Sequence, residues 1–245
     1  MTVGSRQASS ESQLYWVAEN VIRNDFPDVR TALRDPDGLL AIGGDLSPER
    51  LLHAYRRGIF PWYSQGQPIL WWSPNPRCVI EPPSFRISRS LRKTLRRNPF
   101  RVTFNQAFDA VIAACAAPRA NSPGTWITRD MNRAYRRLNE SGHGLSVECW
   151  VGDRLAGGLY GVVIGRIFFG ESMFSRETDA SKVALVHLVR ELDRRGFRLI
   201  DCQLHSQHLQ SMGACPMPRD LFINILRHYC PLDTPRDWPA VSEAV

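Results

Sequence analysis

The order of secondary structure predicted for residues 145–203 restricts the fold more than any other feature of the chain. Residues 145–174 contain three β-rich stretches separated by glycine turns, which is the pattern of an antiparallel meander. Residues 181–196 have the apolar spacing of a helix and end in glycine, and residues 197–203 are typical of a strand. The strand–helix–strand unit over 166–203 should have a right-handed crossover. We therefore predict an α+β protein with a mixed, mainly antiparallel sheet.

Helix-capping residues define a further element near the start of the chain. Ser47 suits an N-cap, Pro48 suits the first helical position, and Gly58 suits the position after the last turn. These signals predict a helix over 48–57. Strands are also predicted over 78–81 and 100–105, and helices over 105–116, 131–142 and 219–229.

Alternation along the two strands of the strand–helix–strand unit predicts a polar cleft. Side chains of a strand point alternately to opposite faces, so Glu171, Met173 and Ser175 should share one face. By the same rule Asp201 and Gln203 should share one face of the later strand, with Cys202 opposite. Because the two strands should be parallel neighbours, these side chains are expected to line one cleft.

Residues 56–77 combine three tryptophans with four prolines, a spacing that no helix tolerates. Such a segment is typical of a packed joint between domains, but tryptophan rings can also stack on nucleic-acid bases. Both interpretations stay open on composition alone. The SPNPR motif at the end of this segment suggests a boundary between a small N-terminal domain, 1–75, and a larger domain, 76–245. Residues 1–13 resemble a loose tail.

The positive charge of the chain is concentrated in one segment. The formal net charge is +7, and residues 86–101 contain seven basic residues and no acid. Within RSLRKTLRR the basic side chains recur at helical spacing, with Leu91 and Leu95 on the other side. This one-sided stripe favours binding to phosphates or another polyanion over a merely solvated helix face.

Several classes of protein are disfavoured by the sequence. The polar start lacks the apolar core of a signal peptide, and the most apolar run, 157–170, is too short to span a bilayer. Scattered cysteines without a CxxC pair suggest reduced thiols in a cytosol. Cys202, His205, His208 and Cys215 cluster, but their spacing matches no usual zinc site, so no metal is expected.

The strand–helix–strand unit would also suit an acetyl-CoA-dependent N-acetyltransferase. Such enzymes hold a pyrophosphate on a glycine-bearing turn at a helix N-terminus. Here the corresponding residues, 176–181, contain no glycine, and Glu177 and Asp179 would repel the phosphates. That cofactor is therefore not expected. A non-catalytic RNA-binding module is the other alternative, although it would not need the acidic cleft.

Several long motifs together resemble one family. They are GLLAIGGDLSPERLLHAYRRGIFPWYS, ILWWSPNPR, GTWITRDM, FFGESMFSR, IDCQ and HLQSMGA. In this order, over about residues 26–220, they are similar to leucyl/phenylalanyl-tRNA–protein transferases. The resemblance implies a small N-terminal α/β domain followed by an acyl-CoA N-acyltransferase-like domain. It also implies a cytoplasmic, monomeric enzyme without cofactors, which transfers leucine or phenylalanine, and methionine less well, from tRNA to proteins that begin with Arg or Lys. The products would enter N-end-rule degradation.

The resemblance also implies roles for individual residues. The proposed catalytic residues are Asp201, Gln203 and Glu171. The aminoacyl side-chain pocket maps onto Leu159, Phe168, Met173, Ser175, Leu185 and Ile200. Trp62 and Trp126 match positions that hold the terminal adenosine of the tRNA, whereas Trp71 and Trp72 are assigned to packing. The tRNA-binding cluster comprises Arg86, Arg89, Arg92, Lys93, Arg96 and Arg97.

Overall fold

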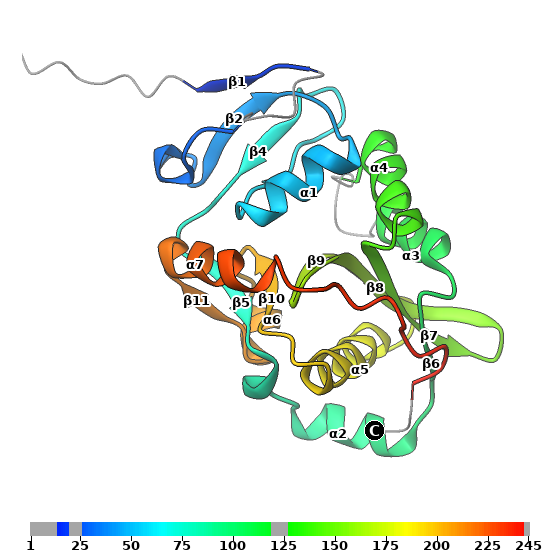
Figure 1. Cartoon of the computed structure of the whole chain (residues 1–245). Coiled ribbons are helices and arrows are strands. Elements are labelled where there is room, and N and C mark those ends of the chain that lie inside the picture. The colour runs from blue at the N-terminus through cyan, green and yellow to red at the C-terminus, as the bar shows by residue number, and fades with distance from the viewer. Residues whose placement is uncertain (1–13, 20–25, 119–126, 243–245) are drawn as a thin grey trace, which may run out of the picture.

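The computed structural model describes residues 14–19, 26–118 and 127–242, which form two sheets and the helices that cover them (Figure 1). Within these residues no helix is both long and apolar enough to cross a bilayer. The mixture of helices with two mixed sheets agrees with the predicted α+β class.

The larger sheet has seven strands in the order β11-β5-β10-β9-β8-β7-β6. β9 and β10 pair in parallel and the other neighbours are antiparallel, so the predicted meander and the parallel strand–helix–strand unit are confirmed. Its strands, in chain order, are β5 (Arg77–Ile80), β6 (Arg101–Phe104), β7 (Gly144–Val151), β8 (Arg154–Ile164), β9 (Ile167–Ser175), β10 (Leu199–Gln203) and β11 (Cys215–Met217).

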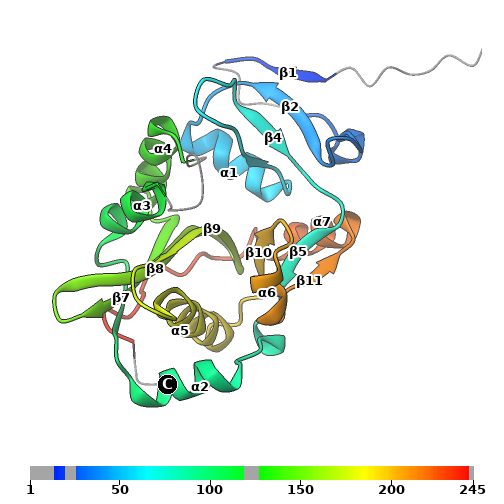
Figure 2. The ribbon, with the colours of Figure 1, turned by 180° about the vertical axis from the view of Figure 1, so that it is seen from behind.

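Helices cover both faces of this sheet. The helices are α1 (Pro48–Arg56), α2 (Arg89–Arg97), α3 (Phe108–Ala116), α4 (Arg129–Glu140), α5 (Ala180–Arg194), α6 (Gln207–Ser211) and α7 (Arg219–Tyr229). Figures 1 and 2 show α5 on one face and α3 with α4 on the other. The predicted helices form close to their expected bounds, and Ser47 caps α1 through a hydrogen bond from the Arg50 amide. The short elements α6 and β11 were not predicted.

The smaller sheet has the order β1-β2-β4-β3 and lies above α1 in Figure 1. Its strands are β1 (Tyr15–Val17), β2 (Leu39–Gly43), β3 (Phe60–Pro61) and β4 (Leu70–Trp72). Trp71 is fully buried, and its indole N–H donates to the Gly43 carbonyl at 2.9 Å. One cluster of buried side chains extends from Trp71 to Phe169 and Phe222, and so joins this sheet to the larger one.

The tryptophans of residues 56–77 divide between packing and exposure. Trp72 packs edge to face against Trp62 and donates its indole N–H to the Trp62 carbonyl at 2.7 Å. Trp62 itself keeps 40% of its surface exposed. Pro61 lies in β3, an edge strand, where its missing N–H costs no ladder hydrogen bond. The segment therefore forms a packed joint that leaves one tryptophan ring accessible.

Two bulges, one in β9 and one in β10, interrupt the regular alternation of side chains that the sequence predicted. Between β8 and β9, Tyr160 lies opposite Ser172 but Gly161 lies opposite Gly170, so Glu171 is the extra residue. Bulges of this kind redirect a side chain and reverse the faces beyond them. Met173 consequently packs with the side chains on the α5 side of the sheet, whereas Glu171 points to Tyr55 and Tyr135 on the other side. The expectation of one shared face was wrong.

The second bulge separates Asp201 from Gln203. Asp201 lies opposite Val79 and Gln203 lies opposite Cys78, which leaves Cys202 as the extra residue. Gln203 has a φ of 60°, in the left-handed region. Asp201 is fully buried, while Cys202 and Gln203 both line a cavity that Asp201 does not reach. The Asp201 and Gln203 side chains both point toward the α1 side of the sheet, as predicted, through Arg77 and Glu171 respectively. The expectation that Asp201 lines the cleft was wrong, because its carboxylate is taken up by Arg77.

The bulge at Glu171 in β9 explains why the facing position 161 of β8 is glycine. An added Cβ would lie 2.2 Å from the Phe169 carbonyl oxygen and 2.4 Å from the Phe168 ring. We expect Gly161→Ala to lower the free energy of unfolding by about 1–3 kcal/mol, the usual cost of overpacking. Gly170→Ala is the matched control, because its Cβ meets nothing nearer than 3.4 Å. Denaturant unfolding of both variants checks this, and equal stability of the two would contradict the described register.

Candidate active site

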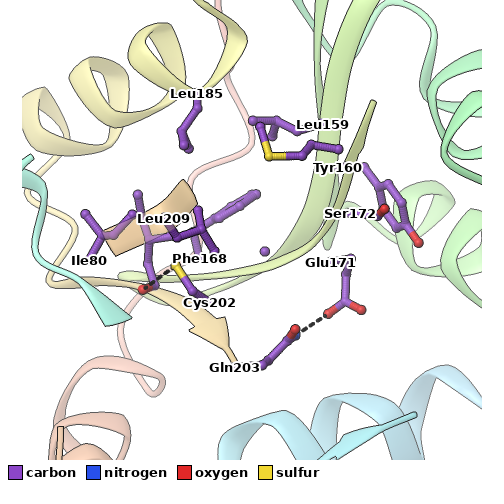
Figure 3. Close-up of a pocket in the computed structure, with 13 residues that line it drawn as sticks. Ile80, Leu159, Tyr160, Phe168, Glu171, Ser172, Leu185, Cys202, Gln203 and Leu209 are labelled. Atoms are coloured by element: carbon purple, nitrogen blue, oxygen red, sulfur yellow. Dashed lines mark hydrogen bonds between the residues drawn. The ribbon is translucent and has the colours of Figure 1, made fainter. Parts of the chain in front are cut away.

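A cavity of about 150 Å³ opens where β9 and β10 stop pairing. The two strands pair from Ile167 with Leu199 to Phe169 with Asp201. The residues of each strand that follow this paired stretch form part of the cavity wall. The full lining is Ile80, Leu159, Tyr160, Phe168, Gly170, Glu171, Ser172, Met173, Leu185, Ile200, Cys202, Gln203 and Leu209 (Figure 3). The cavity is thus apolar over most of its wall and polar near Glu171 and Gln203.

The structure brings most of the predicted pocket residues together. The cavity wall includes Leu159, Phe168, Met173, Leu185 and Ile200. Ser175 lies outside the lining at the exposed end of β9, where its hydroxyl accepts a hydrogen bond from the Ser181 amide at 3.0 Å and so caps α5. Sequence reasoning missed Ile80, which β5 brings to the same wall, and Leu209, which α6 brings there.

Glu171 is held by hydroxyl and amide groups from three separate elements. Tyr55 of α1 donates to Oε1 at 2.6 Å, and Tyr135 of α4 donates to Oε2 at 2.7 Å. The side-chain amide of Gln203 donates to Oε1 at 3.2 Å, the contact drawn between these residues in Figure 3. Glu171 therefore connects α1, α4 and β10 at the polar end of the cavity.

Burial raises the pKa of Glu171 from 4.5 to about 7, against the opposing effect of the tyrosine hydrogen bonds. The hydroxyls of Tyr55 and Tyr135 also lie 2.7 Å apart. With the carboxyl group they make a closed ring of three short O···O contacts, and the two phenols supply only two protons. In the protonated form Glu171 donates to one tyrosine, that tyrosine donates to the other, and the second donates back to the carboxyl group, so all three contacts are satisfied, in agreement with the raised pKa.

Asp201 lies beneath this site in a buried ion pair. The Arg77 guanidinium donates from Nε to Oδ1 and from Nη2 to Oδ2, both at 2.7 Å. The Gln203 main-chain N–H donates to the same Oδ1 at 2.9 Å. Asp201 therefore contacts the backbone of Gln203 and does not contact the cavity.

Two other features bear on the chemistry available here. A hydrogen bond with Cys78 and burial raise the pKa of the Cys202 thiol, which disfavours a thiolate nucleophile in the cavity wall. In the described part of the chain, His, Cys, Asp and Glu side chains do not gather into a group of three that could hold a metal ion. The site therefore offers an apolar cavity, an amide, and a carboxyl group that titrates near neutral pH.

Comparisons with known proteins connect this geometry with a family. A family model described as leucyl/phenylalanyl-tRNA protein transferase matches residues 79–227, and a model of that family's N-terminal domain matches residues 44–75. The chain belongs to the leucyl/phenylalanyl-tRNA protein transferase family. Tyr55 falls within the N-terminal match, whereas Tyr135, Glu171 and Gln203 fall within the other.

Relatives named leucyl/phenylalanyl-tRNA–protein transferase are similar over most of their length. The relative from Aromatoleum aromaticum is 62% identical over 82% of this chain and 84% of its own. The relative from Cellvibrio japonicus is 57% identical over 88% and 91%, and that from Pseudomonas syringae is 54% identical over 93% and 98%. The solved structure of L-PGS from Bacillus licheniformis aligns at a TM-score of 0.38 with 10% identity, over 69% of this chain and 54% of that one, too weak a likeness to support an argument.

The residues expected to contact tRNA lie away from the cavity wall. The basic side chains of α2 and Arg86 are exposed, while Leu91 and Leu95 are buried beneath them. The exposed residues are Arg86, Arg89, Arg92, Lys93, Arg96 and Arg97. Trp62 is partly exposed. Trp126, the other tryptophan expected to contact the adenosine, lies outside the residues that the structure describes.

The raised pKa of Glu171 makes stability depend on pH. Between pH 4.5 and about 7 the folded protein retains a proton that the unfolded chain releases, so this contribution is present below pH 4.5 and lost as pH rises through 7. We expect the stability of the unsubstituted protein relative to Glu171→Gln to fall by at most about 3 kcal/mol over this range.

Urea unfolding at several pH values measures this difference. Glu140→Gln, which removes an exposed carboxylate on α4, is the control for loss of a charge. Parallel pH profiles for the unsubstituted protein and Glu171→Gln would show that folding does not raise the pKa of Glu171, and would contradict a protonated Glu171 in the hydroxyl ring.

Proposed function

We propose that this chain transfers leucine or phenylalanine, and methionine less well, from aminoacyl-tRNA to the amino terminus of proteins that begin with Arg or Lys. The name of its relatives, leucyl/phenylalanyl-tRNA–protein transferase, supports the reaction. The observation that carries the proposal is the apolar cavity whose polar end holds Glu171 and Gln203. An aminoacyl group has the same division, with an apolar side chain next to a polar ester.

The cavity supports a graded selection among amino acids. Leu159, Leu185 and Ile200 provide aliphatic surface, Phe168 an aromatic ring, and Met173 a flexible thioether. Leucine and phenylalanine side chains fill such a space, whereas alanine and valine leave part of it empty. One methylene contributes only about 1–3 kcal/mol to discrimination, so rejection of smaller side chains should be gradual.

The proposed chemistry is aminolysis of an ester. The acceptor amine attacks the ester carbonyl carbon, a C–N bond forms, and the bond from that carbon to the ribose oxygen breaks. The proton lost by the amine ends on the ribose oxygen, so the tRNA leaves with a free hydroxyl group. An ester is already activated, so the reaction needs no ATP, metal ion or CoA.

The polar residues would act by position and charge. Gln203 offers amide groups beside the reacting carbonyl, and Asp201 acts through Gln203 as a positioning residue. A protonated Glu171 adds no negative charge beside the acceptor amine, so it does not favour the unreactive ammonium form. The balance between the ammonium form and the neutral amine matters because an α-amino group has a pKa of about 7.7–8.0, so both forms are present near neutral pH.

The remaining surfaces suit a charged tRNA. We assign the exposed cations of α2 and Arg86 to phosphates of the acceptor stem, and Trp62, together with Trp126, to the terminal adenosine. We further propose a division into a small N-terminal domain, 1–75, and an acyl-CoA N-acyltransferase-like catalytic domain, 76–245. The enzyme acts as a cytoplasmic monomer, and its products enter N-end-rule degradation.

Transfer of radiolabelled leucine from Leu-tRNA to a peptide that begins with Arg tests the proposed function directly. We expect incorporation with Leu and Phe, less with Met, and little with Val or Ala. The same peptide with an acetylated amino terminus is the control, because it lacks the nucleophile. Absence of transfer to the free peptide, or equal transfer of Ala and Leu, would contradict the assignment of the cavity.

The cationic surface predicts how tRNA binding depends on salt. Each phosphate contact contributes about 0.7–0.9 to the slope of log affinity against log salt concentration. Arg89→Ala combined with Arg96→Ala should weaken binding and flatten this slope by about 1.4–1.8 in filter binding. Arg154→Ala combined with Arg227→Ala removes the same charge from other exposed positions. An equal effect of the two pairs would indicate that only net charge matters.

A further inference from the structure

We infer that Arg77 is a positioning residue for the transfer reaction, and that it sets the geometry of Gln203 through Asp201. The inference rests on the proposed function and adds a residue to it. Arg77 lies between the two matched ranges of the family, 44–75 and 79–227. It is one of the largest fully buried side chains of the described residues, with 1% of its surface exposed.

Every polar group at the end of the Arg77 side chain has a specific partner. Nε and Nη2 bind the two oxygens of Asp201, and Nη1 donates to the Gly58 carbonyl at 3.1 Å. The guanidinium lies between two aromatic rings, with its central carbon 4.6 Å from the centre of Phe60 and 4.8 Å from that of Phe222. A planar cation with donors in a fixed fork suits this site, and lysine does not reproduce it.

Asp201 connects the fixed guanidinium of Arg77 to Gln203, which lines the cavity. Its Oδ1 accepts hydrogen bonds from both Arg77 Nε and the Gln203 main-chain N–H. Gln203 has a φ of 60°, a conformation that costs a residue other than glycine about 1–2 kcal/mol. The Asp201 contact helps to hold this conformation, which directs the Gln203 amide to Glu171 at 3.2 Å.

The end of α1 and the residues that follow it contact Glu171 directly and Asp201 through Arg77. Tyr55 donates to Glu171, and the Gly58 carbonyl accepts from the arginine that holds Asp201. Gly58 has a φ of 74°, and a Cβ there would lie 2.5 Å from Ile223. The residues before β5 therefore hold Glu171 through Tyr55 and Arg77 through Gly58. The packing of this segment against the larger sheet sets the distance between the Glu171 and Gln203 side chains.

The variant Arg77→Lys tests this inference because it keeps the charge and loses the fork. We expect single-turnover transfer at saturating Leu-tRNA to fall about tenfold or more, with Leu-tRNA affinity changed less than about twofold. Arg219→Lys is the matched control. Arg219, the first residue of α7, is also buried and donates to the Ser73 carbonyl at 2.5 Å, without contacting either carboxyl group of the site. It should lose stability but not rate per folded molecule.

A double-mutant cycle separates positioning from general loss of stability. If Arg77 acts through Asp201, Arg77→Lys combined with Asp201→Asn should be no slower than the slower single variant. Additive losses, or a normal rate in folded Arg77→Lys, would overturn the inference.

A spectroscopic measurement distinguishes failure of the inference from failure of the proposed function. The Gln203 main-chain amide proton, bonded to a carboxylate, should shift in the NMR spectrum of Arg77→Lys and stay unchanged in Arg219→Lys. If the unsubstituted protein does not transfer leucine, the proposed function fails while this shift still tests the positioning. An unchanged Gln203 signal in Arg77→Lys overturns the positioning regardless of activity.

Discussion

The buried ion pair between Arg77 and Asp201 is the interaction on which the arrangement of this site depends. Burying two charges costs several kcal/mol per ion, and only close geometry with further hydrogen bonds offsets that cost. Here two contacts of 2.7 Å, a third to Gly58 and two flanking aromatic rings supply that geometry. The pair joins β5 and β10 of the larger sheet to the end of α1. Removing either partner would leave a charge buried without its counterion.

Two bulges in β9 and β10 determine where the polar side chains of the site lie around the ion pair. The bulge at Cys202 lies between Asp201, which is buried in its ion pair under the site, and Gln203, which lines the cavity. The bulge at Glu171 turns that carboxyl group toward the tyrosines of α1 and α4. In regular strands, alternation would have placed the carboxyl groups of Glu171 and Asp201 in one cleft. The bulged strands instead give one charged carboxylate in an ion pair and one that titrates near pH 7.

Local patterns in the sequence predicted much of the fold. The meander, the parallel strand–helix–strand unit, the cap at Ser47 and the helix α7 all depend on residues close to one another in the chain. Most of the predicted pocket residues also meet, because they follow the apolar faces of β8, β9 and α5. Ser175 does not join them, because it lies at the end of β9 and caps the next helix.

The polar partners could not be predicted in this way. Tyr55 and Tyr135 are separated from Glu171 by 116 and 36 residues, and Arg77 is separated from Asp201 by 124. A lone aspartate in the apolar strand LIDCQ indicates that a buried cation is needed, but not which arginine supplies it. Alternation placed Asp201 beside Gln203, but it could not show that Arg77 binds both Asp201 oxygens and keeps the carboxylate out of the cavity.

A crystal structure with a non-hydrolysable leucyl adenosine tests the central claim most directly. That claim is that Gln203 meets the reacting group while Asp201 stays in its ion pair. The account predicts the leucyl side chain among Leu159, Phe168 and Leu185, its carbonyl beside the Gln203 amide, and Asp201 still bound to Arg77. An Asp201 carboxylate released from Arg77 and in contact with the aminoacyl group would contradict it.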